Sequence, residues 1–247
     1  MVMIPYPDTQ LMALILHLET ATTASSVALS LHGELLAVSE RNEKNLHASV
    51  ITLLIAEVLE LAGVSLSRLN AISVSKGPGS YTGLRIGVAT AKGLCYALDI
   101  PLIGINTLEA MSSGLQGMKT GLTWGNASLP ELLCPLIDAR RMEVYMALFD
   151  PYGNAVRQTS AEIIDEHTFA PLLLTNQVVF FGDGAAKIEQ LYPENPRAIF
   201  IPDFLNSAAF QPALALAKFN HSVFETLHTF EPFYLKEFFS PQPASKA

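Results

Sequence analysis

A glycine-rich segment is the clearest candidate for chemistry in this sequence. Residues 76–93 read KGPGSYTGLRIGVATAKG, in which Gly77 and Gly79 permit backbone conformations closed to other residues, and Pro78 stiffens the turn. Ser80 can cap a helix that follows it, and a helix N-terminus preceded by glycines can bind an anion. Gly77, Gly79 and Ser80 are therefore a candidate anion-binding turn. The segment matches neither the Walker pattern nor GxGxxG, so the sequence favours the alternative, a structural strand-to-helix turn.

Other catalytic patterns are missing from the sequence. The six histidines, at positions 17, 32, 47, 167, 221 and 228, form no pair spaced by four residues of the kind that binds a metal ion on a helix. No G-x-S-x-G motif supports a serine nucleophile. Cys95 and Cys134 lie in apolar runs and are predicted to be buried, reduced thiols. The residue patterns alone therefore support neither a serine hydrolase nor a histidine metal site.

Four charged residues in the second half of the chain suggest a turn. Asp138, Arg140, Arg141 and Glu143 follow one apolar run and precede another. Charged turns are more often structural than catalytic, so we interpret these residues as a turn and salt-bridge cluster.

The stretch after the glycine-rich turn is predicted to be a helix that packs closely. Gly83, Gly87 and Ala91 recur every four residues. A glycine inside a helix costs on the order of 1 kcal/mol relative to alanine, so the close approach of another helix or strand is expected as compensation. Arg85 and Lys92 share one face, either as a solvated basic edge or as a contact for an acidic partner or phosphate.

A second predicted helix, residues 46–62, is apolar around most of its circumference. Such a helix must be covered on more than one side. It is either sandwiched within its own domain or packed on its own sheet and on a partner, and the sequence leaves both possibilities open.

The remaining elements suggest an α/β protein with two similar units. LILHLE–turn–SVALSLHGE and LCPLID–turn–EVYMALFDPYG share one plan, which indicates a structural duplication. The predicted strands are 14–18, 27–31, 35–40, 71–75, 101–105, 134–138, 143–149, 155–160 and 178–181. The other predicted helices are 82–98, 108–115, 165–174, one after 185, and 208–224. Residues 193–202 are expected to be a loop, and EPFYLKEFF near the end a docked extended segment. The expected domains are an extension (1–12), a first lobe (13–115), an exposed loop (116–130), a second lobe (131–240) and a tail (241–247).

Composition limits the function further. The 247 residues are 50% hydrophobic and 15% charged, with a net charge of −8. An acidic chain lacks the clustered cations that broad nucleic-acid binding needs, so a partner would supply the main grip on any RNA. Neither a membrane-spanning apolar run nor a signal-peptide pattern is present, which favours the cytoplasm.

Three segments together closely resemble the TsaB (YeaZ) family: KGPGSYTGLRIGVATAKGL, LETATTASSVAL and LIDARRMEVYMALFD, with the end Pro232–Lys236 fitting as well. The resemblance spans roughly residues 14–236. It implies a two-lobed actin-like (ASKHA, ribonuclease H-like) fold with a duplicated βββαβα unit. It also implies a non-catalytic scaffold partner of TsaD, which makes threonylcarbamoyladenosine at position 37 of tRNA. The chain would form a heterodimer with TsaD and a homodimer alone, enable binding of the ATPase TsaE, and meet tRNA indirectly, away from any membrane.

The resemblance also implies that the chain is not an enzyme, with no catalytic residue, no metal ligand and no cofactor. TsaD carries Asn-His-x-x-x-His, whose histidines bind metal, whereas this chain has Asn106, Thr107 and Met111 at the matching positions. Glu19 stands where the family usually has Asp, at a position that organises metal and phosphate in actin-like ATPases. The rival hypotheses are a small-molecule kinase or ATPase that uses the Glu19 and Gly77–Gly79 turns, and a metallopeptidase, which would need zinc.

By the same resemblance, the two long helices would form the surface that binds TsaD. The predicted interface residues are His47, Val50, Ile51, Leu54, Val58, Gly83, Arg85, Ile86, Gly87, Thr90 and Gly93.

Overall fold

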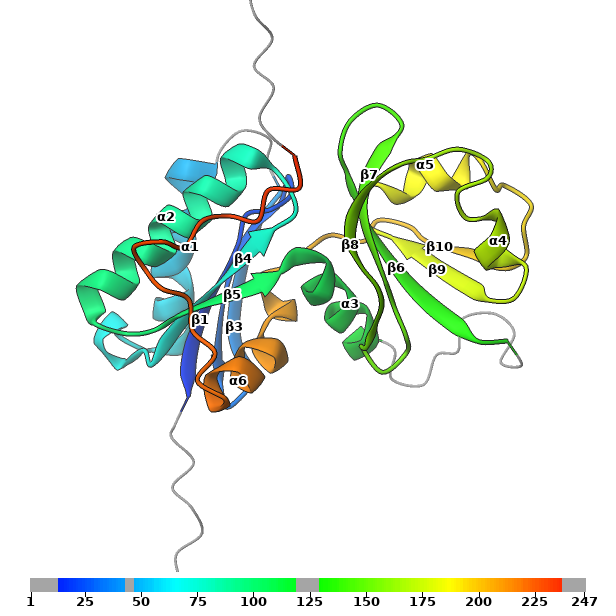
Figure 1. The fold of residues 1–247 in the computed structure, drawn as a ribbon. Helices are drawn as coiled ribbons and strands as arrows, with labels where there is room; N and C mark the ends of the chain where they lie inside the picture. The colour runs from blue at the N-terminus through cyan, green and yellow to red at the C-terminus, as the bar shows by residue number, and fades with distance from the viewer. Residues whose placement is uncertain (1–12, 43–46, 119–128, 237–247) are drawn as a thin grey trace, which may run out of the picture.

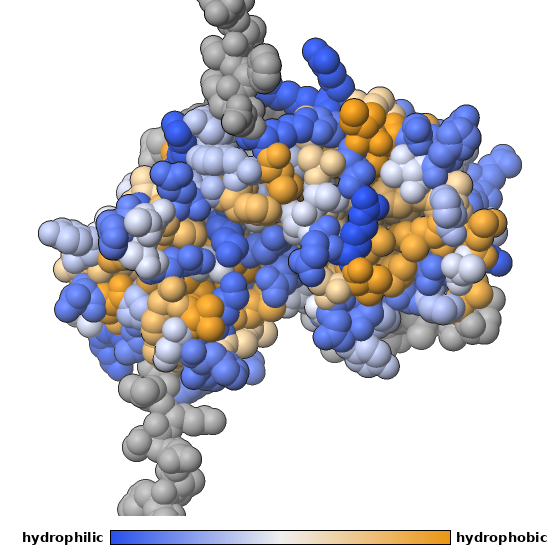
Figure 2. Space-filling model, viewed as in Figure 1, coloured by the Kyte–Doolittle hydropathy of each residue, from blue (hydrophilic) through white to orange (hydrophobic). Residues whose placement is uncertain are grey.

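The computed structural model describes residues 13–42, 47–118 and 129–236, which form two lobes, each built around a five-stranded sheet (Figure 1). The first sheet contains β1 (Leu14–Glu19), β2 (Ser25–Leu31), β3 (Glu34–Arg41), β4 (Ala71–Gly77) and β5 (Leu102–Asn106). The second contains β6 (Glu131–Asp138), β7 (Glu143–Phe149), β8 (Ala155–Ile163), β9 (Gln177–Phe181) and β10 (Ala198–Ile201). Figure 2 shows hydrophobic residues on the surface of both lobes and a largely hydrophilic band between them.

The two sheets have the same topology. Their strand orders are β3-β2-β1-β4-β5 and β8-β7-β6-β9-β10, so each lobe places its first strand in the centre. In each, the first three strands form an antiparallel meander, and the last two are parallel to the first. This repetition confirms the predicted duplication and the two-lobed actin-like α/β fold.

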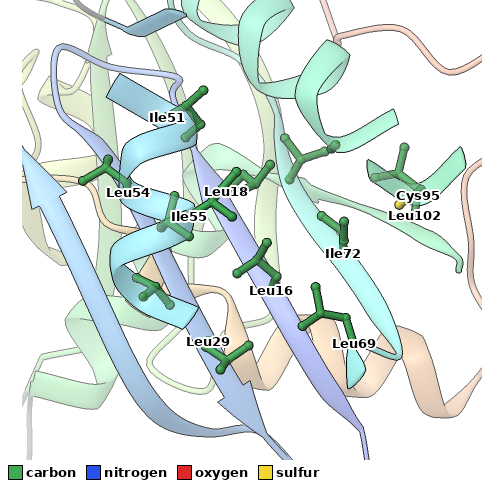
Figure 3. Packing of buried hydrophobic residues seen from close by; sticks show 14 of the residues in the cluster. Leu16, Leu18, Leu29, Ile51, Leu54, Ile55, Leu69, Ile72, Cys95 and Leu102 are labelled. Atoms are coloured by element: carbon green, nitrogen blue, oxygen red, sulfur yellow. The ribbon is translucent and has the colours of Figure 1, made fainter. Parts of the chain in front are cut away.

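Both faces of β1 are covered, which explains its nearly continuous apolar sequence. Leu16 and Leu18 pack with Ile51 and Leu54 of α1 (His47–Ala62) on one face, where α2 (Tyr81–Leu98) also lies. Figure 3 shows these side chains meeting between α1 and the strands of the first sheet. On the other face, Ile15 packs with residues of α3 (Thr107–Met118) and α6 (Pro212–Asn220). Because successive side chains of a strand point to opposite faces, the apolar residues of β1 contact helices on both sides of the sheet.

Helix α3 lies between the lobes. Its residues Leu108, Met111 and Leu115 join a core cluster with residues of β6, β7 and β9. The opposite face of the second sheet is covered by two short helices, α4 (Ala170–Leu173) and α5 (Ala185–Glu189). One helix that begins in the first lobe therefore supplies apolar side chains to the second.

The chain returns to the first lobe after β10. The 3-10 helix η2 (Ala208–Phe210) and α6 pack on strands of the first sheet. Beyond α6, the backbone N–H of Phe233 donates to the carbonyl of Lys76 (2.6 Å), so this end is docked in an extended form, as predicted. Residues 208–236 thus pack with the first lobe, although the predicted boundaries place them in the second (131–240).

Three predicted elements differ from the structure. The expected loop 193–202 contains β10, a four-residue strand that pairs in parallel with β9. The expected helix 165–174 is reduced to α4, and the expected helix 208–224 divides into η2 and α6. The predicted extension 1–12, the tail 241–247 and most of the loop 116–130 lie outside the described residues.

Candidate functional site

The glycine-rich turn joins β4 to α2 by close backbone packing. Gly77 adopts φ +114°, a conformation that favours glycine, and Ser80 accepts a hydrogen bond at its hydroxyl from the N–H of Gly83 (3.2 Å). The predicted helix cap at Ser80 is therefore confirmed.

The turn between β1 and β2 occupies the space in front of α2. The N–H of Ser80 donates to the carbonyl of Ala21 (2.7 Å), and a Cβ added at Gly79 would lie 2.3 Å from the same carbonyl oxygen. A bound anion would need backbone N–H donors such as that of Ser80, and here the Ala21 carbonyl already accepts from the Ser80 N–H. The anion-binding role of Gly77, Gly79 and Ser80 stays a prediction.

The glycine row of α2 packs on the same β1–β2 turn. A Cβ at Gly83 would lie 2.0 Å from the carbonyl oxygen of Thr20, and one at Gly87 would lie 2.3 Å from the Thr20 hydroxyl oxygen. That hydroxyl donates to the carbonyl of Gly83 (2.8 Å). A close approach is therefore present, as predicted, but it comes from Thr20 in the β1–β2 turn of the same chain and not from another helix or strand.

Glu19 ends β1 as a fully buried carboxyl group. The Ala21 N–H donates to one of its oxygens (2.7 Å), and the Ser75 hydroxyl donates to the other. Burial raises the pKa of Glu19 against these hydrogen bonds, which lower it. Within the described residues, no three His, Cys, Asp or Glu side chains gather where they could hold a metal ion.

A buried polar network runs from Glu19 toward the start of α6, and the sequence patterns did not reveal it. His17 contacts the hydroxyls of Ser73 (2.6 Å) and Ser30 (2.7 Å). Gln211 accepts from Ser73 (2.6 Å) and donates to Ser75 (3.2 Å). The network ties β1 and β4 to the segment that returns from the second lobe. Alternating serines on β2 and β4 were the only available signal.

The segment that matches the metal-binding stretch of TsaD lies in the interlobe core. Asn106 accepts at Oδ1 from the N–H of Leu108 (2.9 Å), and its Nδ2 donates to Thr159 in the second lobe (3.0 Å). Thr107 and Met111 are buried. Asn106 therefore caps α3 and links the lobes, while Met111 packs in the apolar core.

The predicted interface residues divide into two groups in the structure. Ile51, Leu54, Val58, Gly83 and Gly87 are buried inside the first lobe, so they present no surface to a partner. Val50, Ile86 and Thr90 are half-buried, whereas Arg85 and Gly93 are exposed. The side chain of His47 lies outside the description.

Three further apolar side chains lie on the exposed faces of the same helices. Leu53 and Leu61 of α1 are 62% and 70% exposed, and Tyr96 of α2 is 84% exposed. A Cβ added at Gly93 would meet no atom within 4 Å. The apolar pattern of α1 thus includes one set of residues for its own sheet and another that faces outward.

Arg85 and Lys92 hold the end of the described chain. The Arg85 guanidinium lies 4.4 Å from the ring centroid of Tyr81, and its Nε donates to the hydroxyl of Tyr234 (3.2 Å). Lys92 donates to the carbonyl of Phe230 (3.0 Å). This basic edge is neither simply solvated nor free for a partner, because residues 230–234 pack against it.

In the charged turn between β6 and β7, the two acids form salt bridges with lysines elsewhere in the chain, and the two arginines form none among the described residues. Asp138 pairs with Lys187 of α5 (2.8 Å), and Glu143 pairs with Lys236 at the end of the described chain. Asp138 also accepts from the backbone N–H of Arg140 (2.6 Å). The cluster therefore joins three segments that are far apart in the sequence.

The duplicated sheets and the turns that pack against β1 define a two-lobed protein of the actin-like class. A family model described as TsaD, tRNA N6-adenosine threonylcarbamoyltransferase, matches residues 34–245. The tRNA threonylcarbamoyladenosine biosynthesis protein TsaB of Haemophilus influenzae is 30% identical over 235 residues, covering 90% of this chain and 93% of the relative. This chain belongs to the TsaB (YeaZ) family.

Two further comparisons agree with this assignment. TsaB of Escherichia coli is 36% identical over 142 residues, which cover 58% of this chain and 57% of the relative. The solved structure of YeaZ from Pseudomonas aeruginosa superimposes with a TM-score of 0.75 at 26% identity, covering 91% of this chain and 100% of that one. In the described part of this chain, no helix combines the length and apolar character that crossing a membrane requires.

Proposed function

We propose that this chain is a non-catalytic scaffold subunit of the complex that installs threonylcarbamoyl on adenosine 37 of tRNA. It pairs with a TsaD-type catalytic subunit, enables TsaE to join, and meets tRNA through the assembled complex in the cytoplasm. Membership of the TsaB family supports the pathway. The observation that carries the scaffold role is the exposed apolar surface of α1 and α2.

This surface, which we call the outer helix face, consists of Leu53, Leu61, Gly93 and Tyr96. Large apolar side chains that are more than half exposed on neighbouring helices are typical of a protein interface. Gly93 has open space where a Cβ would stand, so a partner backbone can approach α2 closely there. The same face can bury itself against a second copy, which accounts for a homodimer when the partner is missing.

Two features support a non-catalytic role. Thr107 and Met111 stand where the catalytic relative carries imidazoles, and hydroxyl and thioether groups do not replace imidazoles at such a metal site. An actin-like kinase or ATPase would use the Glu19 and Ser80 turns for metal and phosphate. Here the Ser80 N–H donates to the Ala21 carbonyl and the Thr20 hydroxyl donates to the Gly83 carbonyl, so the two turns hydrogen-bond to each other. No specific observation favours the kinase or ATPase alternative.

The proposal is tested by association with a purified TsaD-type subunit. We expect the mixture to elute as one complex in size-exclusion chromatography. A double variant, Leu53→Lys with Tyr96→Lys, should bind roughly tenfold or more weakly, because lysine brings charge into an apolar contact. Leu174→Lys is the matched control, since Leu174 is 73% exposed on the second lobe, away from the outer helix face.

Three results would contradict the proposal. The wild-type chain and the TsaD-type subunit could elute separately, or the double variant could bind as tightly as the control. Reconstituted tRNA modification could also proceed equally well without this chain. Magnesium-dependent ATP turnover by the lone chain would favour the rival enzyme.

A further inference from the structure

The fold gathers four cations that are scattered in the sequence. Arg140 and Arg141 lie in the β6–β7 turn, Lys187 lies on α5, and Lys236 is the last described residue. The ion pairs of Lys187 with Asp138 and of Lys236 with Glu143 bring these segments together. In Figure 1 the red end of the described chain lies on the side of the first lobe that faces the second lobe. The sequence alone showed only the Arg140–Arg141 pair.

Within this cluster the two arginines differ from the two lysines. Each lysine neutralises a carboxylate, so the pairs Lys187–Asp138 and Lys236–Glu143 contribute little net charge. The side chains of Arg140 and Arg141 are exposed, and neither forms an ion pair with any residue in the described ranges. A third acid, Asp183, accepts from the N–H of Asp138 (2.8 Å), so the cluster keeps a net positive charge that the two exposed guanidinium groups carry.

The backbone holds the two arginines in a defined position. Both adopt left-handed conformations, with φ +71° at Arg140 and +49° at Arg141. The N–H of Arg140 donates to Asp138 (2.6 Å), and the N–H of Glu143 donates to the carbonyl of Arg140 (3.2 Å). Left-handed conformations cost energy for residues other than glycine, and here hydrogen bonds on both sides of the turn maintain them. Adjacent guanidinium groups are thus presented from an ordered turn.

We propose that Arg140 and Arg141 bind the phosphate backbone of RNA. This inference rests on the proposed function, which brings the chain to a tRNA substrate. Guanidinium groups match phosphate oxygens with paired N–H donors, and they keep their charge at any physiological pH. Because the whole chain carries a net charge of −8, the contact is local and supplements the grip of the complex.

The end of the described chain meets the same turn, because Lys236 pairs with Glu143 at the start of β7. Figure 2 shows hydrophilic surface along the upper boundary between the lobes. An acidic protein partner is the competing occupant of this turn.

The test measures the affinity for a fluorescently labelled tRNA transcript by anisotropy, with the full chain alone and with its TsaD-type complex. The variants are Arg140→Gln with Arg141→Gln, which removes both charges, and Arg140→Lys with Arg141→Lys, which keeps them. Arg68→Gln removes an exposed charge elsewhere on the first lobe. Each phosphate contact contributes about 0.7 to 0.9 to the slope of log affinity against log salt. Between 50 and 200 mM salt, the wild type should therefore lose roughly tenfold more affinity than the glutamine variant.

The lysine variant and Arg68→Gln should keep the wild-type salt slope. The inference is overturned if the glutamine variant binds RNA with the wild-type affinity and slope, or if the wild type binds RNA in neither form. It is also overturned if the glutamine variant binds RNA normally but associates less with TsaD or TsaE, which would make the turn a protein contact. Complex formation is measured separately by chromatography, so a failure of the proposed function is distinguished from a failure of this inference.

Discussion

The packing of α2 on the β1–β2 turn predicts opposite effects for the same substitution at two glycines of one helix. Gly83→Ala would place a Cβ 2.0 Å from the Thr20 carbonyl oxygen, whereas real Cβ atoms essentially never come closer than 3.0 Å to such an atom. Gly93→Ala would place a Cβ in open space. Both substitutions gain about 1 kcal/mol of helix propensity, so the difference between them isolates the steric conflict.

The size of the expected change in unfolding free energy depends on how rigidly the atom that the new Cβ meets is held. At Gly83 the conflicting atom is the Thr20 carbonyl oxygen, which belongs to the backbone, so the helix and the turn must separate by about 1 Å. We take the free-energy cost of this overpacking as ~3 kcal/mol. We therefore expect Gly83→Ala to lose about 2 kcal/mol of unfolding free energy and Gly93→Ala to gain about 1 kcal/mol. For a chain of this length the gap corresponds to roughly 6–12 °C in melting temperature, measured by calorimetry or circular dichroism.

A substitution at a third glycine, Gly87, tests which atom of Thr20 makes the contact. At Gly87 the obstacle is the Thr20 hydroxyl oxygen, 2.3 Å from the added Cβ, which is a side-chain atom. Thr20→Ala should therefore relieve Gly87→Ala, with a coupling of about 1–2 kcal/mol in a double-mutant cycle. The same change should not relieve Gly83→Ala, because the Thr20 carbonyl remains. Equal stability of Gly83→Ala and Gly93→Ala, or an absence of coupling at Gly87, would refute this account of the glycine row.

Two further predictions concern buried titratable groups. Burial raises the pKa of the Cys95 thiol to about 12 and also raises that of Cys134, so at pH 8 a thiol reagent should modify both only as fast as the chain unfolds. Rapid labelling of the native protein would contradict this burial. Burial lowers the pKa of His17 to about 3, while the unfolded chain takes up this proton near pH 6.5. The free energy of unfolding should therefore fall as the pH drops from 6.5 toward 3, by up to ~1.4 kcal/mol per pH unit from this residue. A His17 ring resonance that titrates near pH 6.5 in the folded protein would show that the imidazole is accessible.

The sequence predicted the local features of the fold well because their causes are local. The strands of the first lobe carry apolar runs bounded by polar turns, and β1 differs from its predicted range only by including Glu19. Ser80 was identified as a cap because it precedes a helix and follows glycines. By contrast, β10 is only four residues long and follows a proline-rich stretch. Its pairing with β9 decides its structure, and no local pattern signals that pairing.

The sequence indicated which kinds of contact the candidate site contains, but not which distant residues supply them. Glycines at every fourth position required a close neighbour, yet Thr20 is 63 residues away from Gly83 in the sequence. The apolar circumference of α1 left two possibilities open, and burial assigns Ile51, Leu54 and Val58 to the core. Leu53 lies in the apolar helix 46–62 but is not among the predicted interface residues, because separating the outward from the inward face requires knowing where the sheet lies.

In both copies of the duplicated unit, a glycine-containing turn packs closely at the end of the central strand. In the first lobe, Gly79 and Gly83 bring α2 onto the β1–β2 turn, and hydrogen bonds within the chain join the two turns. In the second lobe, a Cβ at Gly182 would lie 2.3 Å from the Leu136 carbonyl oxygen, so the turn before α5 presses on the end of β6 in a similar way.

What differs is the turn that follows the central strand. After β1 the turn begins with two buried, uncharged residues, Thr20 and Ala21, whereas the turn after β6 contains the exposed residues Arg140 and Arg141. If the arginines were merely structural, their replacement should change stability and leave RNA binding unchanged. The exposed, unpaired guanidinium groups instead predict a loss of RNA affinity with little change in stability, because no contact within the described fold depends on their charge.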